Sequence, residues 1–479
     1  MLFNSIDFAV FLPIVFILYW FVTDKNLKLQ NFLIVAVSYV FYGWWDWRFL
    51  SLILFSTLVD YSVGLILKTE DNQAKRKLLL WISILVNLGF LGFFKYYNFF
   101  LDNFVTAFSF FGTEIKANSL NIILPVGISF YTFQTLSYTI DVYKRKLEPT
   151  KDFIAFAAFV CFFPQLVAGP IERATNFLPQ FYKKRTFDYA KAVDGMRQIL
   201  WGLFKKVVIA DNCAEYANMI FNNSIDYSGS TLVLGALFFT IQIYVDFSGY
   251  SDIGIGTARL FGFNLKQNFA FPYFSRNFAE VWRRWHISLT TWFRDYLFIP
   301  LIKAGNINVF SKVSKVLILF ITIGLWHGAN WTFIMWGLFQ AILILPSILK
   351  KNKTDIRDIV AKGKMFPSLK EFFYMGKTFS LIVFTMVFFR AESLTHAFQY
   401  FKGIFQYSLL EVPEALPIPV IILTVIFIIM EWIHRDKQYG LQFDDAKIPK
   451  VIRWCLYLVI SFTIAVFFGK GNPFIYFQF

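Results

Sequence analysis

His327 stands out among the few polar groups that a strongly apolar chain offers for chemistry. It lies in the segment GLWHGANWTF (324–333) and is one of four histidines among 479 residues. The apolar run Val316–Trp326 precedes it and the apolar run Trp331–Leu349 follows it. A neutral imidazole can act as a general base toward a hydroxyl group, and an ionisable residue at membrane depth is a functional candidate by default. The competing interpretation is a structural histidine bonded to a carbonyl of a broken helix.

The length of the first run suggests how deep His327 lies. The run and its basic flank would form a helix of about 14 residues, roughly 21 Å long, against a hydrocarbon core of roughly 30 Å. Basic residues flank both runs, so both flanks are expected on the cytoplasmic side. We therefore expect a re-entrant hairpin, with structural roles for Trp326 and Asn330 beside the histidine.

A second histidine, His286, lies in a segment rich in tryptophan and arginine (281–298). Basic groups interleaved with tryptophan suit a phosphorylated, adenine-bearing donor such as coenzyme A. Anchoring to lipid by the same side chains is the alternative. His286 would then be a second polar group at the reaction centre, or a residue at its rim. The candidate donor-binding residues are Arg283, Arg284, Trp285 and Arg294.

Two carboxylates, Asp246 and Asp252, fall within or at the end of another apolar run. Carboxylates placed there need partners, and Lys205 and Lys206 or a nearby arginine could supply them. We predict structural ion pairs rather than catalysis, with neighbouring glycines such as Gly249 allowing close helix approach.

The segment 474–479 reads FIYFQF, and Tyr476 offers a phenol that could carry an acyl group covalently. The sequence alone favours a different interpretation, in which these side chains form a plug at the membrane surface.

Composition defines the class of protein. Apolar residues make up 57% and charged residues 16%, whereas a soluble domain averages about 25% charged. Most basic residues sit in short loops beside apolar runs, so the net charge of +15 indicates membrane orientation and lipid contact rather than nucleic-acid binding. Three cysteines without paired spacing predict neither a disulfide framework nor a metal site.

The positive-inside rule predicts an all-α polytopic protein with both termini outside the cytoplasm and one domain, 1–479. Two re-entrant segments are expected, at 153–168 and around His327, and the region 259–303 is expected to form cytoplasmic amphipathic helices. The ten predicted crossings are 7–22, 29–42, 49–67, 78–94, 122–143, 197–213, 232–255, 379–389, 417–432 and 451–468.

Four long motifs in this order resemble the membrane-bound O-acyltransferase family, in its bacterial branch of alginate and peptidoglycan O-acetylation proteins. The motifs are FFPQLVAGPIER (162–173), DFSGYSDIGIGTARLFGF (246–263), FPYFSRNFAEVWRRWHISLTTWFRDYLFIPL (271–301) and GLWHGANWTFIMWG (324–337). One departure is visible, because relatives tend to carry a Gly pair where this chain has Leu301-Ile302-Lys303.

The resemblance implies a fold and an activity. His327 matches the family's catalytic histidine, and His286 matches its second active-site polar position. The implied enzyme lies in the bacterial inner membrane, takes acetyl from cytoplasmic acetyl-CoA without a metal, and O-acetylates an extracytoplasmic polysaccharide through a periplasmic SGNH-type partner. Acylation of peptidoglycan or teichoic acid is the alternative within the family. A polysaccharide or small-molecule transporter, or a scaffold for a soluble acetylase, are the alternatives outside it.

Overall fold

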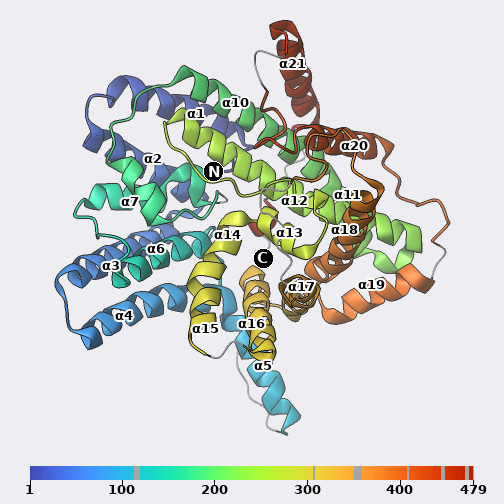
Figure 1. The fold of residues 1–479 in the computed structure, drawn as a ribbon, viewed down its shortest axis with the longest axis horizontal. Coiled ribbons are helices and arrows are strands. Elements are labelled where there is room, and N and C mark those ends of the chain that lie inside the picture. Colours follow the sequence, from blue (N-terminus) through green and yellow to red (C-terminus); the bar gives the residue numbers. More distant parts are fainter. Residues whose placement is uncertain are drawn as a thin grey trace. The chain divides into compact units, whose positions relative to one another are not determined.

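The computed structural model describes residues 1–112, 119–167, 169–305, 308–349, 359–406, 409–443, 448–469 and 474–477. Across these ranges the regular structure is helical, without strands (Figure 1). The predicted all-α class is therefore confirmed.

The chain divides into two compact units, residues 1–195 with 257–266, and residues 196–256 with 267–479. Two helices, α10 (Tyr189–Leu203) and α12 (Gly229–Leu260), contribute residues to both units. The single domain 1–479 stays a prediction.

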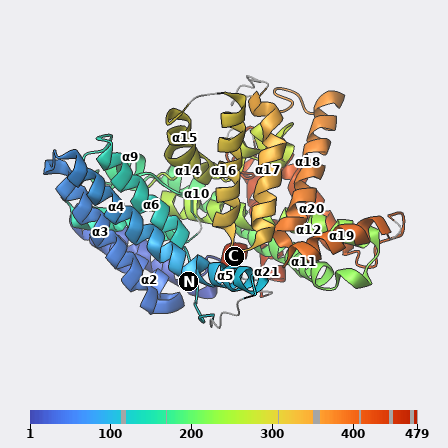
Figure 2. The ribbon, with the colours of Figure 1, turned by 90° about the horizontal axis from the view of Figure 1, so that it is seen from below.

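In the first unit, helices far apart in sequence pack through a buried polar group. Figure 2 shows α3, α4 and α6 side by side, as their packing contacts require. The Asp60 carboxylate of α3 is fully buried, and it accepts hydrogen bonds from Asn87 Nδ2 (2.8 Å), Thr139 Oγ1 (2.8 Å) and the Ser83 hydroxyl. These donors, which come from α4 and α6, satisfy a carboxylate that burial would otherwise penalise. The helices of this unit are α1 (Ile6–Ile17), α2 (Leu27–Asp46), α3 (Leu50–Thr69), α4 (Gln73–Leu91), α5 (Tyr97–Phe110), α6 (Ile128–Tyr143), α7 (Phe153–Cys161), α8 (Phe163–Leu166) and α9 (Ala174–Phe177).

The second unit contains His286, His327 and the C-terminal segment 474–477. A π-helical turn (Phe204–Ala210) follows α10 directly and leads into α11. The helices are α11 (Asp211–Asn222), α13 (Phe278–Arg284), α14 (Ile287–Phe293), α15 (Ile299–Lys303), α16 (Val309–His327), α17 (Trp331–Leu349), α18 (Leu369–Arg390), α19 (Leu394–Gln406), α20 (Ile418–Ile433) and α21 (Lys450–Phe467). The helices between 267 and 303 are short, as expected for the amphipathic region.

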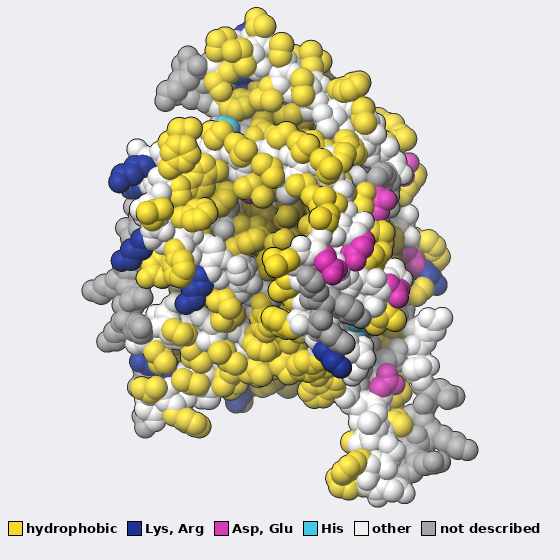
Figure 3. Space-filling view, turned by 90° about the vertical axis from the view of Figure 1, so that its right-hand side faces the viewer, with side chains coloured by type: hydrophobic (Ala, Val, Ile, Leu, Met, Phe, Trp, Pro, Cys, Tyr) yellow, Lys and Arg dark blue, Asp and Glu magenta, His cyan; other side chains and the backbone are white. Residues whose placement is uncertain are grey.

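Several helices are long and apolar enough to cross a membrane, and hydrophobic side chains cover most of the face in Figure 3. The seven segments identified among the described residues are Leu27–Thr69, Gln73–Phe110, Gly229–Leu260, Val309–His327, Trp331–Leu349, Leu369–Arg390 and Lys450–Phe467. Two shorter apolar helices, Ile6–Val22 and Ile418–Ile433, accompany them. This is a multi-pass membrane protein.

Three expectations about individual segments need comment. The helix that ends at His327 has 19 residues, which is roughly 28 Å at 1.5 Å per residue. The expected length of about 14 residues was wrong because α16 begins at Val309, before its basic residues. The helix predicted from 122 begins only at Ile128, after Gly127 with its positive φ of 74°. In 153–168, α7 ends at Cys161 and α8 begins at Phe163, so the break precedes Pro164, and Ala168 lies outside the described residues.

The hairpin that ends at His327 depends on two glycines. Helices α16 and α17 pack closely along their length (Figure 2). A Cβ added at Gly324 would lie on the carbonyl oxygen of Phe333, and one added at Gly337 would lie on that of Phe320. Small residues at such crossings let two membrane helices approach closely.

Replacing Gly337 with Ala should therefore separate the two helices and lower stability by about 1–3 kcal/mol, as overpacking does. The measurement is the thermal unfolding midpoint of the purified protein in detergent. The matched control is Gly376→Ala in α18, where an added Cβ meets no atom within 4 Å. Equal midpoints for the two variants would contradict the packing role.

Candidate active site

His327 is the last residue of α16, and aromatic rings surround it. Its side chain is 4% exposed. The ring centroids of Trp326, Trp336 and Phe389 lie 4.8, 5.1 and 5.1 Å from that of the imidazole. Asn330 lies directly before α17, where it accepts the Thr332 N–H (2.9 Å) and donates to the Glu392 carbonyl (2.9 Å).

His286 occupies the break between α13 and α14. Its backbone is left-handed, with φ 42° and ψ 54°, a conformation that side chains with a Cβ adopt at a cost. The imidazole is fully buried, and the ring of Phe247 packs edge-on to it at 4.6 Å. This break turns the histidine inward instead of leaving it on the face of a continuous helix.

Asn268 fixes the hydrogen-bonding state of His286 and was missed by the sequence reasoning. Its Oδ1 lies 3.1 Å from His286 Nδ1 and also accepts the Ser288 N–H (3.3 Å) and hydroxyl (2.9 Å). Because a backbone N–H only donates, this atom is the carbonyl oxygen, so His286 Nδ1 carries the proton. Nε2 of the neutral ring is then an acceptor. Asn268 follows Lys266 and Gln267 in the sequence, so nothing in its local pattern distinguishes it as a partner of His286.

Tyr476 joins the two histidines. Its ring centroid lies 5.7 Å from that of His327, 6.4 Å from that of His286 and 6.4 Å from that of Trp326. The ring of Phe247 packs against it at 4.4 Å. Both predicted catalytic residues and the candidate acyl carrier therefore meet in one aromatic cluster.

This position contradicts the expected plug at the membrane surface. Phe474 and Ile475 are 0% and 1% exposed, so both belong to the protein interior, and Tyr476 beside them is partly buried. The sequence reasoning failed because apolar residues near a chain end suit either a lipid surface or a core. Gln478 and Phe479 lie outside the described residues.

The predicted ion pairs of Lys205 and Lys206 are present. Lys205 Nζ lies 2.8 Å from Asp252 and 3.7 Å from Glu431. Lys206 Nζ lies 2.8 Å from Asp211 and 3.0 Å from Asp246. Buried charges of this kind require such partners.

Gly249 permits the contact. A Cβ built there would lie 2.9 Å from the Gly202 carbonyl oxygen, so the helix carrying the lysines and α12 touch backbone to backbone. The close approach predicted for this glycine is confirmed.

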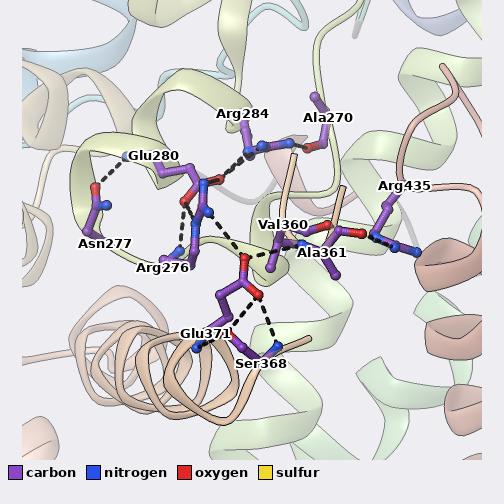
Figure 4. A network of polar contacts seen from close by, with 10 residues as sticks. All are labelled: Ala270, Arg276, Asn277, Glu280, Arg284, Val360, Ala361, Ser368, Glu371 and Arg435. Atoms are coloured by element: carbon purple, nitrogen blue, oxygen red, sulfur yellow. Dashed lines mark hydrogen bonds and ion pairs between the residues drawn. The ribbon is translucent and has the colours of Figure 1, made fainter. Parts of the chain in front are cut away.

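The candidate donor-binding residues lie in different surroundings. Figure 4 shows the Arg284 guanidinium directed at Glu280 (2.9 Å) and at the Ala270 carbonyl (3.2 Å). The positive charge of Arg284 is therefore already compensated within the protein. Arg294 pairs with Asp295 (2.7 Å) while its side chain stays 56% exposed, which leaves it the more accessible of the two.

Trp285 is buried, and its ring stacks on Tyr273 at 6.0 Å. Arg283 precedes it at the end of α13 and is partly exposed. Figure 4 also shows Arg276 reaching both Glu280 (3.1 Å) and Glu371 (3.4 Å). These ion pairs tie α13, and with it the turn at His286, to the start of α18.

The environment of His286 predicts a pH dependence of stability. Burial lowers the pKa of His286 to about 3, from an ordinary value of 6.5. Between these values the unfolded chain binds the proton and the folded chain does not, so stability is lost as the pH falls below 6.5. At 1.36 kcal/mol per pH unit, this histidine accounts for up to about 2.7 kcal/mol between pH 6.5 and 4.5.

Unfolding midpoints of wild type and His286→Gln at pH 7.5 and pH 4.5 test this. The midpoint of the variant should fall less on acidification than that of wild type. The control is His396→Gln, at a partly exposed position in α19. If His286→Gln loses as much stability as wild type, the assignment of a neutral His286 is wrong.

Known proteins are similar in sequence to this chain over most of its length. The model of the membrane-bound O-acyltransferase family matches residues 144–386. A probable alginate O-acetylase AlgI of Azotobacter vinelandii is 39% identical over 413 residues, which cover 85% of this chain and 79% of that protein. A peptidoglycan O-acetyltransferase of Helicobacter pylori is 32% identical over an alignment that covers 100% of this chain and 98% of that protein.

A more distant relative is a teichoic acid D-alanyltransferase of Bacillus subtilis, 30% identical over 47% of this chain and 59% of that protein. The family match includes His286 and His327, the two residues that the structure places against one tyrosine. On these grounds the chain belongs to the membrane-bound O-acyltransferase family and is an O-acyltransferase.

Proposed function

We propose that the protein takes an acetyl group from cytoplasmic acetyl-CoA and passes it across the bacterial inner membrane for O-acetylation of an extracytoplasmic polysaccharide. The observation that supports this most directly is the Tyr476 ring within 6.4 Å of both imidazoles. Relatives named for O-acetylation of alginate and of peptidoglycan support the acetyl group and the class of acceptor.

In the first step, Tyr476 acts as the acyl acceptor. Burial raises the pKa of its phenol above the usual range, so the hydroxyl stays protonated and needs a base to become a nucleophile. His327 takes the phenol proton as Oη attacks the thioester carbonyl carbon. A C–O bond forms, the C–S bond breaks, and the proton passes from His327 to the departing sulfur. The products are O-acetyl-Tyr476 and free coenzyme A.

His286 has a supporting role in this scheme. With Nδ1–H held by Asn268, the neutral Nε2 can accept a hydrogen bond and orient a hydroxyl group. Stabilising an oxyanion would require a proton on Nε2 as well, so the neutral ring fits orientation of the reacting groups better. Arg283, Arg294 and Trp285 are the proposed contacts for the phosphates and adenine of the donor.

In the second step, the acetyl group leaves Tyr476 for a hydroxyl group on the outer side. We propose an SGNH-type periplasmic partner as the receiver and the polysaccharide as the final acceptor, with both termini of the enzyme extracytoplasmic by the positive-inside rule. An alginate-like polymer is the first candidate, and peptidoglycan or teichoic acid is the alternative. The same first step would serve each acceptor.

The base is tested by His327→Ala. The purified variant should release coenzyme A from acetyl-CoA at least about a hundredfold more slowly than wild type, which is the lower range for loss of a general base. Thiol titration measures the release, and His396→Ala serves as the control far along the chain, in α19. Unchanged thioester cleavage in a folded His327→Ala protein would sink the proposal and favour a transporter or a scaffold.

The acyl carrier is tested by mass spectrometry after incubation with acetyl-CoA. We expect a mass increase of one acetyl group on the peptide that contains Tyr476 and none in Tyr476→Phe, which lacks the attacking oxygen. The matched control is Tyr227→Phe, a partly exposed tyrosine before α12. A fully active Tyr476→Phe enzyme would rule out the relay while leaving the acetyltransferase assignment intact.

A further inference from the structure

We propose that α12 contains a seat for the C-terminal segment, formed by Asp246, Phe247 and Tyr250, and that this seat positions Tyr476 beside the histidines. Asp246 Oδ2 accepts the backbone N–H of Ile475 at 2.8 Å. The ring of Phe474 stacks on Tyr250, with centroids 4.3 Å apart and planes 26° apart.

Three consecutive residues of the C-terminal segment each make one contact with α12. Phe474 stacks on Tyr250, Ile475 donates its N–H to Asp246, and Tyr476 packs on Phe247 at 4.4 Å. Residues 246 and 250 lie one helical turn apart and face the same side of α12. One turn of α12 therefore contacts three consecutive residues of the segment, and these contacts position the phenol of Tyr476.

Asp246 makes a second polar contact, with a lysine. Its other oxygen, Oδ1, lies 3.0 Å from Lys206 Nζ, and Asp246 is 1% exposed. An ionised carboxylate makes a stronger acceptor than a neutral oxygen. Lys206 therefore supports the seat, because a cation at this distance favours the ionised form of the carboxylate that accepts the Ile475 N–H.

The seat also reaches His286. Phe247 packs against both the imidazole of His286 (4.6 Å) and the ring of Tyr476 (4.4 Å). One turn further along α12, Ser251 accepts a hydrogen bond from Asn268 Nδ2 (3.2 Å), and Asn268 holds His286. The same stretch of α12 thus orients the proposed acyl carrier and one of the two histidines.

Asp246, Phe247, Tyr250 and Phe474 are positioning residues, since they touch Tyr476 or its neighbours rather than the reacting atoms. Their effect on acetyl transfer rests on the proposed function, whereas the seat itself is a matter of packing. Two pairs of variants of the full chain, purified in detergent, test separately the effect of the seat on acetyl transfer and the docking of the C-terminal segment.

The first pair tests the hydrogen bond. Ile475→Pro removes the N–H that Asp246 accepts, and the fixed φ of proline suits the helical turn at this position. Ile475→Ala keeps the N–H and serves as the control. With acetyl-CoA as the probe, the rate of acetyl incorporation at Tyr476 should fall on the order of a hundredfold in Ile475→Pro, as for misplaced reacting groups. The KM for acetyl-CoA should stay unchanged in both variants.

The second pair tests docking without chemistry. Phe474→Ala removes the stack on Tyr250, whereas Phe468→Ala removes an exposed ring that follows α21. Carboxypeptidase should trim Tyr476 faster from Phe474→Ala than from Phe468→Ala, with trimming followed by intact-mass spectrometry. If the two members of either pair behave alike, the seat is overturned. If wild-type Tyr476 takes up no acetyl group, the relay has failed, and the trimming comparison alone decides the seat.

Discussion

The pairing of buried charges between Lys206 and α12 is the interaction on which the site depends. A buried lysine and a buried carboxylate offset part of each other's desolvation cost, and the close contact at Gly249 brings their helices near enough to pair. Asp246 then has an oxygen to spare for the N–H of Ile475. Without the ion pair, burial of this carboxylate would cost more free energy, and the hydrogen bond that attaches the C-terminal segment to α12 would be weakened.

The two histidines are held in different ways, which suits different tasks. His286 is fixed by a left-handed backbone and by the Asn268 side chain, so its tautomer is set before any substrate arrives. His327 ends a helix and is confined by the rings of Trp326, Trp336 and Phe389. These three rings restrict the orientation of the imidazole by packing alone. Confinement by packing is compatible with the proton exchange that we propose for His327.

Much of this organisation follows from the sequence. Apolar runs and basic loops predicted the helical membrane class, and the position of His327 between two apolar runs predicted a hairpin end. The partnership of Asp246 and Asp252 with Lys205 and Lys206 could be predicted because ionisable groups within apolar helices commonly pair with one another. The length of α16 could not be predicted, because its two lysines resembled the residues that flank a helix but lie inside the helix near its start.

What the sequence could not supply were contacts between distant segments. Asn268 carries no local signal of a link to His286, because the link arises only when α13 breaks and turns the imidazole back. The interior position of Phe474 and Ile475 is similar, since their apolar character fits a lipid surface as well as a core. The deciding feature is a single carboxylate on α12, which no periodicity in the segment itself reveals.

The distance along the chain between Asp246 and Ile475 has a consequence for biosynthesis. The two residues are separated by 229 positions, so α13 through α21 must be made and packed before the segment can reach α12. Contacts of such long range form late. A nascent chain would thus hold His286 and His327 well before Tyr476 joins them, and the acyl relay that we propose for Tyr476 would await completion of the fold.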